Sequence, residues 1–526
     1  MSQDVPARRS ILLGTGLLWG VGAIVAAQAV SWSGGFFHDD AYITLRYAQN
    51  WLAGNGIGWN PGDRVEGYTN FLQLLLATGL GALGMDLVRA AQAIGAASWL
   101  GLALFAIGRC ERSVRGAWLV SLPGVAAGAS ASLIAWTFGG LEAPLFALLV
   151  TAGVVWLGDA LSRRDVSDGG PRRRLAWSGA AFALACLTRM DAALFVAVAA
   201  VFWIATRRDR MSDLLAFAAP LAVVLLPWLV WKQAYYGALL PNTWWVKGTG
   251  LTAWRLADGL AYAAAFLATP PFPVIWLFAG AVRAWMRRRL EAADGFGLAV
   301  VATQLAWVVY VGGDQMPASR LLVPLVPVSA WLALRLWRPD LDALGSRGVV
   351  GASVAVASCV ALQLAWPIAA EPLRNATAFM GAAVGRHAAE HFRPGALVAL
   401  NTAGSTPFHA PGLRYVDMLG LNDAHIARRQ VGEPRVAGQR MPGHRKGDGA
   451  YVLAQRPDYL ILGPAHGARK DEPWFLSDLE IAQNPSFLRD YRLRVTRIDV
   501  RDQSGFEEVP AARSGSFPFT YYERVR

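Results

Sequence analysis

The first 370 residues of the chain alternate between apolar runs and short clusters of arginine, and this alternation limits what the chain can fold into. The full 526 residues are 54% hydrophobic and only 16% charged, whereas a soluble protein carries about a quarter charged residues. The first run, residues 11–30, is long enough to cross a bilayer as a helix. We therefore expect a multi-pass membrane protein whose surroundings are the lipid bilayer.

The positions of the basic residues indicate which loops lie in the cytoplasm. A formal net charge of +12 at pH 7 could suggest nucleic-acid binding. However, the arginines lie in clusters between the apolar runs, at 8–9, 109–115, 163–174, 207–210, 283–289 and 335–347. Such clusters mark cytoplasmic loops, so we expect no nucleic-acid partner. Cys110, Cys186 and Cys359 lie in or beside apolar runs without a CxxC motif, and we expect neither a disulfide nor a zinc site.

The same clusters fix the number of crossings, because an even number must separate one cytoplasmic cluster from the next. From the second cluster onward the apolar runs fall in pairs before a last span: 117–136 with 145–158, 175–188 with 192–206, 212–234 with 270–286, 296–312 with 320–337, then 347–368. In the earlier interval, parity makes 87–108 a crossing and 69–85 a helix on the outer surface. We expect about eleven spans in the cell (inner) membrane, a cytoplasmic N-terminus with an uncleaved anchor, and an external C-terminus.

Residues 370–526 have a different composition. They are polar, with short apolar segments at 396–400 and 459–462 that turn sequences separate, a pattern typical of strands. We expect a transmembrane domain, 1–369, whose first external loop spans 31–86, followed by a small external α/β domain, 370–526. The predicted fold class is therefore mostly α: a polytopic helical bundle followed by this α/β domain.

Two adjacent acids, Asp39 and Asp40, follow the first apolar run and should lie outside the membrane. Ionisable groups at a membrane are costly and usually functional. The structural alternative is that Asp40 is the N-cap of a helix over 41–51, but this role leaves Asp39 unexplained. The pair is our first candidate for catalysis.

The expected topology collects the other unusual polar residues on the outer side. In the first external loop they are His38, Arg46, Arg64, Glu66, Tyr68 and Asn70, and in later outer turns they are Glu142, Arg189, Asp191, Tyr236, Asn242, Lys247, Asp314 and Arg320. Glycine, proline and asparagine also end helices, and aromatic residues anchor membrane interfaces. Charged groups in five outer turns nevertheless favour a shared site.

One reaction uses this set. Transfer of a sugar from a polyprenyl phosphate needs a carboxylate to accept the proton of the acceptor hydroxyl, which Asp40 or Asp39 could supply. It also needs cations for the departing phosphate, and Arg189, Lys247 and Arg320 suit that role because Arg and Lys both bind phosphate. The remaining candidates would bind the sugar or the acceptor, which we expect to be a cell-envelope glycan.

Segments along nearly the whole chain resemble, in order, those of the mycobacterial-type terminal β-arabinofuranosyltransferases and their bacterial homologues, members of the GT-C superfamily. The segments are FFHDDAYITLRYAQNWLAGNGIGWNPGDRVEGYTNFL (36–72), GGLEAPLF (139–146), LTRMDAALF (187–195), YYGALLPNTWWVK (235–247), VGGDQMPASR (311–320), NTAG (401–404), VDMLGLND (416–423) and HRKGDG (444–449). The resemblance implies a decaprenyl-phosphoryl-arabinofuranose donor, an inverting transfer outside the membrane, and a catalytic base in the acidic pair. Met190 and Gln315 depart from the family pattern, at positions where related turns often carry a proline and an aromatic residue.

Other functions remain open on these residues. The same fold could use another polyprenyl-phosphate sugar to modify lipopolysaccharide, teichoic acid or protein. A transporter of lipid-linked sugars is less well supported, because transporters tend to show internal repeats and mid-membrane charges. A sensor would need a cytoplasmic output module. We expect no cofactor: a divalent cation would suit oxygen ligands, but adjacent acids on a helix diverge by about 100°.

Overall fold

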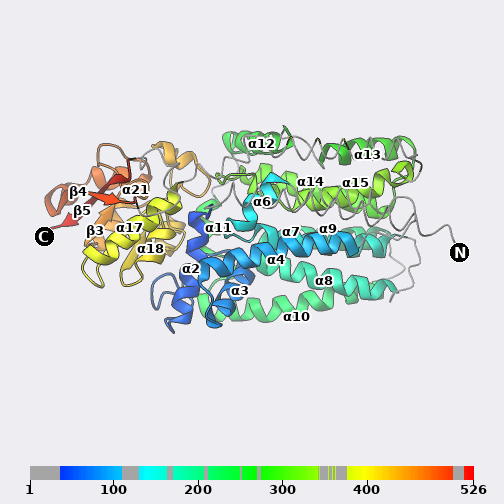
Figure 1. Cartoon of the computed structure of the whole chain (residues 1–526), viewed down its shortest axis with the longest axis horizontal. Helices are drawn as coiled ribbons and strands as arrows, with labels where there is room; N and C mark the ends of the chain where they lie inside the picture. The colour runs from blue at the N-terminus through cyan, green and yellow to red at the C-terminus, as the bar shows by residue number, and fades with distance from the viewer. Residues whose placement is uncertain are drawn as a thin grey trace.

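The computed structural model describes residues 36–108, 130–162, 170–206, 211–248, 252–268, 274–341, 376–501 and 514–525, with isolated positions at 343, 354, 358 and 362. It is an elongated molecule with a bundle of long helices at one end and a smaller domain with a sheet at the other (Figure 1). The expected spans at 11–30 and 347–368, most of the one at 117–136, and several basic clusters lie outside the described residues.

The bundle consists of long apolar helices. Its elements are α3 (Phe71–Ala82), α4 (Leu87–Gly108), α6 (Ala131–Phe138), α7 (Ala143–Leu161), α8 (Gly170–Thr188), η1 (Met190–Ala192), α9 (Ala193–Thr206), α10 (Met211–Tyr236), α12 (Ala253–Ala268), α13 (Val274–Met286), α14 (Ala292–Val311), η3 (Arg320–Leu322) and α15 (Leu325–Leu341). Five described helices are long and apolar enough to cross a membrane, and three shorter apolar ones accompany them. The mostly helical fold is confirmed, while the number of spans stays a prediction.

Two helices of the bundle show its inside and its outside. Helix α7 is largely enclosed by the other helices, with Phe146, Val150 and Val154 at 2% exposure or less. Helix α10 instead leaves Val223 and Val230 at least 70% exposed. Exposed apolar side chains on a long helix are what contact with lipid requires. The sequence did not indicate α12, which follows the tryptophan-rich turn after α10.

The second domain is built on a five-stranded sheet. Its elements are α17 (Thr377–His391), β1 (Leu397–Leu400), α18 (Ser405–His409), β2 (Arg414–Asp417), α19 (Ala424–Arg428), η6 (Ala437–Arg440), α20 (Gly449–Ala454), β3 (Tyr459–Ile461), α21 (Leu476–Ala482), α22 (Pro485–Asp490), β4 (Tyr491–Asp499) and β5 (Ser516–Arg524). The strand order is β2-β1-β3-β5-β4. Strand β1 pairs in parallel with β2 and β3, and β5 is antiparallel to β3 and β4. The two expected strands are β1 and β3, so the α/β fold is confirmed. The expected boundary at 369/370 lies outside the described residues.

Helix α2 (Asp39–Leu52) lies at the junction between the bundle and the second domain, with the short helix α11 (Asn242–Lys247) near it (Figure 1). Uncharged hydrogen bonds join the two parts here. Trp59 Nε1 donates to the carbonyl oxygen of Ala403 at 3.0 Å, and Tyr47 Oη bonds Asn422 Oδ1 at 3.0 Å. Asn242 Nδ2 donates to the carbonyl oxygens of Gly420, Leu421 and Asp423. These hydrogen bonds therefore fix the orientation of α2 relative to the bundle and to the second domain.

Candidate active site

Helix α2 begins at Asp39, and its N-cap is His38. The Nδ1 atom of His38 accepts a hydrogen bond from the backbone N–H of Asp40 at 3.2 Å and so satisfies a donor of the first turn. The alternative that Asp40 caps a helix beginning at 41 is therefore wrong. Burial lowers the pKa of His38, so the ring is neutral and its 3.9 Å approach to Asp40 Oδ1 is not an ion pair.

Asp39 points toward the second domain. Its Oδ1 atom accepts hydrogen bonds from the backbone N–H of Ser405, at 2.8 Å, and from the Ser405 hydroxyl. The side chain is buried, and burial raises the pKa of Asp39 to about 6 against the opposing effect of the Ser405 bonds. Asp39 therefore holds the start of α2 against the start of α18.

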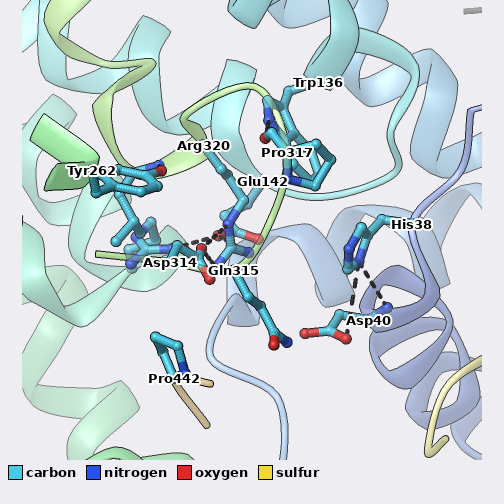
Figure 2. Close-up of polar contacts among 12 residues, drawn as sticks. His38, Asp40, Trp136, Glu142, Tyr262, Asp314, Gln315, Pro317, Arg320 and Pro442 are labelled. Atoms are coloured by element: carbon cyan, nitrogen blue, oxygen red, sulfur yellow. Dashed lines mark hydrogen bonds and ion pairs between the residues drawn. The ribbon is translucent and has the colours of Figure 1, made fainter. Parts of the chain in front are cut away.

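Asp40 points elsewhere, because successive helical residues are rotated by about 100°. Its side chain is 32% exposed, and it faces the turn that carries Asp314 and Gln315 (Figure 2). Within the described ranges no side chain donates a hydrogen bond to its carboxylate. Asp40 is thus a carboxylate that remains accessible at the junction.

The turn at 312–319 carries Asp314 and Gln315 toward Asp40. Gly312 (φ 84°) and Gly313 (φ 74°) adopt left-handed conformations that end α14, which glycine does without strain. The far end of the turn is fixed by Trp136, whose Nε1 donates to the carbonyl oxygen of Pro317 at 3.1 Å (Figure 2). The two anchored ends set the direction of the side chains between them.

Behind the turn lies a buried group of alternating charges, Glu142, Arg189, Asp191, Asp314 and Arg320, which we name the ion-pair cluster. Arg320 bonds Asp314 Oδ2 through Nε at 3.0 Å and through NH2 at 2.8 Å. Arg189 donates hydrogen bonds to both carboxylate oxygens of Asp191, at 3.1 and 3.0 Å, and to Glu142 Oε1 at 2.8 Å. Both predicted phosphate-binding arginines are therefore already paired with carboxylates.

The charges of the ion-pair cluster compensate one another. Burial by itself would raise the pKa of Glu142, but Arg320 and Arg189 outweigh burial and hold that pKa below its ordinary value. The pKa of Asp314 is lowered in the same way, because Arg320 and Lys247 outweigh burial. The acids are therefore ionised, and two arginines face three carboxylates before Lys247 is counted.

Lys247, at the end of α11, has no carboxylate within ion-pairing distance in the part of the chain that the structure describes. Its side chain is exposed, yet the surrounding protein lowers the pKa of Lys247, while the charges of Asp314 and Asp40 raise it. Lys247 is thus accessible to solvent and interacts electrostatically with both Asp314 and Asp40. Within the described part of the site, Lys247 is a solvent-exposed cation without a carboxylate partner.

The second domain also reaches this site. His444 Nε2 lies 3.3 Å from Gln315 Nε2, and the charges of Asp40, Lys247 and Asp314 act on the His444 ring. A Cβ atom added to Gly443 would lie 3.3 Å from Lys247 Cε. The loop around residues 441–444 therefore contributes to one side of the site.

The structure places several other candidates away from Asp40. Arg46 is buried and bonds the carbonyl oxygen of Trp59 and the side chain of Gln49. Arg64 is exposed and lies over the Tyr235 ring. Asn242 serves the domain junction, as described above. Asn70 alone joins the ion-pair cluster, because its Nδ2 donates to Glu142 Oε2 at 3.1 Å.

Glu66, Tyr68 and Tyr236 form a separate group. Glu66 Oε2 lies 2.7 Å from Lys232 Nζ, and both side chains are at most 5% exposed. Tyr68 and Tyr236 share a hydrogen bond at 3.1 Å, and Tyr236 donates to the carbonyl oxygen of Ile57. This group links α10 to the loop that follows α2.

The sequence reasoning missed Lys232, Ser405 and the placement of His444. Lys232 is a lone cation inside an apolar run, which is itself a signal. His444 belongs to the HRKGDG segment, but nothing local shows where it points. The acids Asp417 and Asp423 hold turns: Asp417 accepts backbone N–H bonds from Leu419, Gly420 and Asn422, and Asp423 caps α19. Among the described residues, no group of three His, Cys, Asp or Glu side chains is placed to hold a metal ion.

Known proteins resemble this chain in sequence and in fold. A family model described as a domain of unknown function (DUF8728) matches residues 370–513. The chain is 30% identical over 248 residues to the terminal beta-(1->2)-arabinofuranosyltransferase of Mycobacterium tuberculosis and 26% identical over 352 residues to that of Corynebacterium glutamicum. These matches take in 45% and 56% of this chain but only 38% and 47% of the relatives, so the chain spans less than half of their length.

The fold is found in solved structures of ArnT from Cupriavidus metallidurans. The structure bound to undecaprenyl phosphate matches with a TM-score of 0.50 and 16% identity over 76% of this chain and 85% of ArnT. The apo structure matches with a TM-score of 0.51 and 16% identity over 78% and 86%. At this identity the likeness concerns the fold. The chain is thus similar in sequence to part of the terminal beta-(1->2)-arabinofuranosyltransferases, and its fold is that of ArnT.

Proposed function

We propose that the chain is a glycosyltransferase that moves an arabinofuranosyl residue, or a related sugar, from a polyprenyl phosphate to a glycan of the cell envelope. The observation that carries the proposal is that Asp40 and Lys247 belong to one site, where each acts electrostatically on the other but the two described side chains form no ion pair. One is an accessible carboxylate and the other an accessible ammonium group, and both act electrostatically on the same ring, that of His444. The names of the relatives support arabinofuranose as the sugar, and the ArnT complex supports a polyprenyl-phosphate carrier.

In the proposed reaction the oxygen of an acceptor hydroxyl attacks the anomeric carbon of the donor sugar. The bond between that carbon and the phosphate oxygen breaks, and its electron pair leaves with the phosphate. Asp40 accepts the hydroxyl proton as general base. Because attack comes from the face opposite the phosphate, the anomeric configuration inverts.

Lys247 stabilises the negative charge that develops on the departing phosphate. Because Lys247 has no carboxylate partner among the described residues, it can bind the phosphate without first breaking an ion pair. Arg320 and Arg189 lie behind it, and their field adds to the site although their hydrogen bonds are taken up by carboxylates. Because such charges are already held in position, they stabilise the transition state without the cost of reorganising during the reaction. Glu142, Asp191 and Asp314 hold the arginines in place.

The second domain is proposed to guide the acceptor glycan to the site. Gly443 in its loop at 441–444 lies beside the Lys247 side chain, and Ser405 of its helix α18 bonds Asp39. Deleting the whole domain is not a clean test, because it would leave the buried Asp39 carboxylate without its Ser405 donors. Substitutions on the exposed side of the loop should instead raise the KM for acceptor while leaving donor binding unchanged.

The proposed location is the cell (inner) membrane, with the N-terminus in the cytoplasm and the second domain outside. The basic clusters at the ends of the apolar runs support this orientation. A reporter fused after residue 526 should be active only if it works outside the cytoplasm, and one inserted near residue 167 only if it works inside. If both reporters work on the same side, the orientation is wrong.

Transfer from defined donors tests the function directly. The purified protein is given polyprenyl phosphates that carry either arabinofuranose or a hexose, together with an arabinan oligosaccharide, and the product linkage is read by NMR. Arabinosyl transfer with inversion is expected. Transfer from the hexosyl donor alone would favour the alternative sugar, and movement of lipid-linked sugar across a vesicle without transfer would favour a transporter. A deletion strain that accumulates the unused lipid donor would identify the sugar in the cell.

A further inference from the structure

The amide of Gln315 presents a hydrogen-bond acceptor that the protein does not use. Its Oε1 atom is buried, and no described residue donates a hydrogen bond to it. Its Nε2 atom lies 3.3 Å from His444 Nε2. Buried acceptors are almost always paired, so the free oxygen calls for a donor from outside the chain.

The orientation of this amide follows from His444. The Nδ1 atom of His444 lies 3.1 Å from the carbonyl oxygen of Pro442, and a carbonyl can only accept, so Nδ1 carries the proton. Burial lowers the pKa of His444, which leaves the ring neutral and Nε2 with a lone pair. Gln315 Nε2 must therefore donate to that lone pair, and Oε1 points away from His444. The ring itself is held by stacking on Phe475, with centroids 5.6 Å apart and an interplanar angle of 21°.

The location of Gln315 indicates which part of a ligand it would meet. It follows Asp314, which belongs to the ion-pair cluster, and its side chain extends from there toward Asp40 (Figure 2). In the proposed reaction the donor phosphate lies at Lys247 and the attacking hydroxyl at Asp40. The sugar ring must occupy the space between phosphate and base, so the group that lies there contacts the sugar.

We propose that Gln315 Oε1 accepts a hydrogen bond from a hydroxyl of the donor sugar, and that His444 of the second domain fixes the amide in this orientation. The inference rests on the proposed function and deepens it. Gln315 is then a specificity-determining residue, and His444 is a positioning residue that acts through it. The membrane bundle supplies the contact, and the second domain sets its direction.

Binding of singly deoxygenated donors tests the proposal independently of the base. Full-length protein in detergent is titrated with polyprenyl-phosphoryl arabinofuranose and with its 2-, 3- and 5-deoxy forms. One deoxy donor should bind wild-type protein about tenfold more weakly than the full donor, as expected for loss of one hydrogen bond. Gln315→Leu should bind the full donor and that deoxy donor equally. If each deoxygenation weakens wild type and Gln315→Leu by the same factor, the proposal is overturned.

Two further variants separate this role from a structural one. His444→Phe keeps an aromatic ring against Phe475 but removes the lone pair, so the amide can rotate and the discrimination should fall to about threefold or less. Gln73 is the matched control, because its Oε1 atom also lacks a partner among the described residues while its side chain is 1% exposed and closed to ligands. Gln73→Leu should keep the wild-type discrimination, and its loss there would count against the proposal.

Polyprenyl phosphate without a sugar serves as the final probe. It should bind wild type, Gln315→Leu and His444→Phe alike, because its contacts lie at Lys247. If wild-type protein binds neither this lipid nor any sugar donor, the proposed function itself fails. If the lipid and the full donor bind but Gln315→Leu changes no discrimination, the inference fails alone.

Discussion

The two faces of the first turn of α2 differ in what they meet. The Asp39 face meets uncharged donors of the second domain, and its carboxylate is enclosed by Ser405. The Asp40 face meets charge, because Arg320 and Lys247 both lie within reach of its field. In the proposed function these adjacent residues of one type have separate roles, one structural and one chemical. Rotation by about 100° between neighbours leaves Asp40 accessible and Asp39 buried, which is why we propose Asp40 as the proton acceptor.

The largest effect should come from Asp40→Asn, because asparagine keeps the size of the side chain but has no basic lone pair to accept a proton. Loss of a general base costs roughly 10²–10⁴-fold in turnover. A purely structural role in the first helical turn would cost only about 0.3–1 kcal/mol of stability. Turnover, donor binding and thermal unfolding should be measured on the same preparation.

A folded Asp40→Asn protein that binds donor and turns over within threefold of wild type would remove Asp40 as the base. Glu66 is then a poor alternative candidate for the general base. Its carboxylate is paired with Lys232 at 2.7 Å and is 5% exposed, so an acceptor hydroxyl would have to displace that partner.

The next largest effect should come from Lys247→Met, which keeps an unbranched side chain and removes the charge. A charge-assisted hydrogen bond contributes about 1.5–3 kcal/mol, so the Kd for polyprenyl phosphate should rise roughly 10- to 150-fold. Lys232→Met is unsuitable as a control, because it would leave buried Glu66 unpaired. Lys446→Met is suitable, since Lys446 bonds only the Arg429 carbonyl oxygen among the described residues. Equal phosphate affinity in Lys247→Met and wild type would contradict the assignment.

A smaller effect, on stability, should come from Gly404→Ala at the Asp39 face. A Cβ atom there would lie 2.0 Å from the backbone oxygen of Asp39, whereas one at Gly412 would meet nothing within 4 Å. Overpacking of this kind costs about 1–3 kcal/mol. Gly404→Ala should lower the melting temperature and Gly412→Ala should leave it nearly unchanged. Equal melting temperatures for the two variants would mean that the contact between α2 and α18 does not form as described.

The smallest effect should come from Asp39→Asn. The amide oxygen of asparagine can still accept both Ser405 bonds, and removing the charge weakens each because charge-assisted bonds are about twice as strong as neutral ones. Burial raises the pKa of Asp39, so removing the charge also relieves a desolvation cost that opposes the weaker bonds. We expect the unfolding free energy to change by no more than about 1 kcal/mol and turnover to stay within a few-fold of wild type. A loss of turnover as large as that of Asp40→Asn would break the comparison between the two acids.

Features that depend on neighbouring residues could be predicted from the sequence. The apolar runs became helices α4, α7, α8, α9, α10, α13, α14 and α15, and 396–400 and 459–462 became strands β1 and β3. The predicted topology places the turns at Glu142, Arg189, Asp314 and Arg320 on one side of the bundle, and these residues do meet in one cluster. Periodicity and hydropathy are sufficient for such predictions.

Features that depend on contacts between distant residues could not be predicted. Asp39 and its partner Ser405 are separated by 366 positions, and Gln315 and His444 by 129. The pairing of both arginines with carboxylates was also missed, because a charge in a turn does not show whether a partner stands opposite. The start of α2 was misplaced by two residues, since histidine is an uncommon N-cap and the ring of His38 takes the Asp40 N–H first.

The bond between Asp39 and Ser405 also sets an order of events during synthesis. Ser405 leaves the ribosome 366 residues after Asp39, which at ordinary elongation rates is roughly 20–70 s later. Until then the bundle can insert and its ion pairs can form, while the start of α2 has no docking partner and His444 does not yet exist to orient Gln315. If the proposed function holds, a half-made chain has the cations for a lipid phosphate before the sugar site is complete, and a chain that stops early should use the sugar donor poorly.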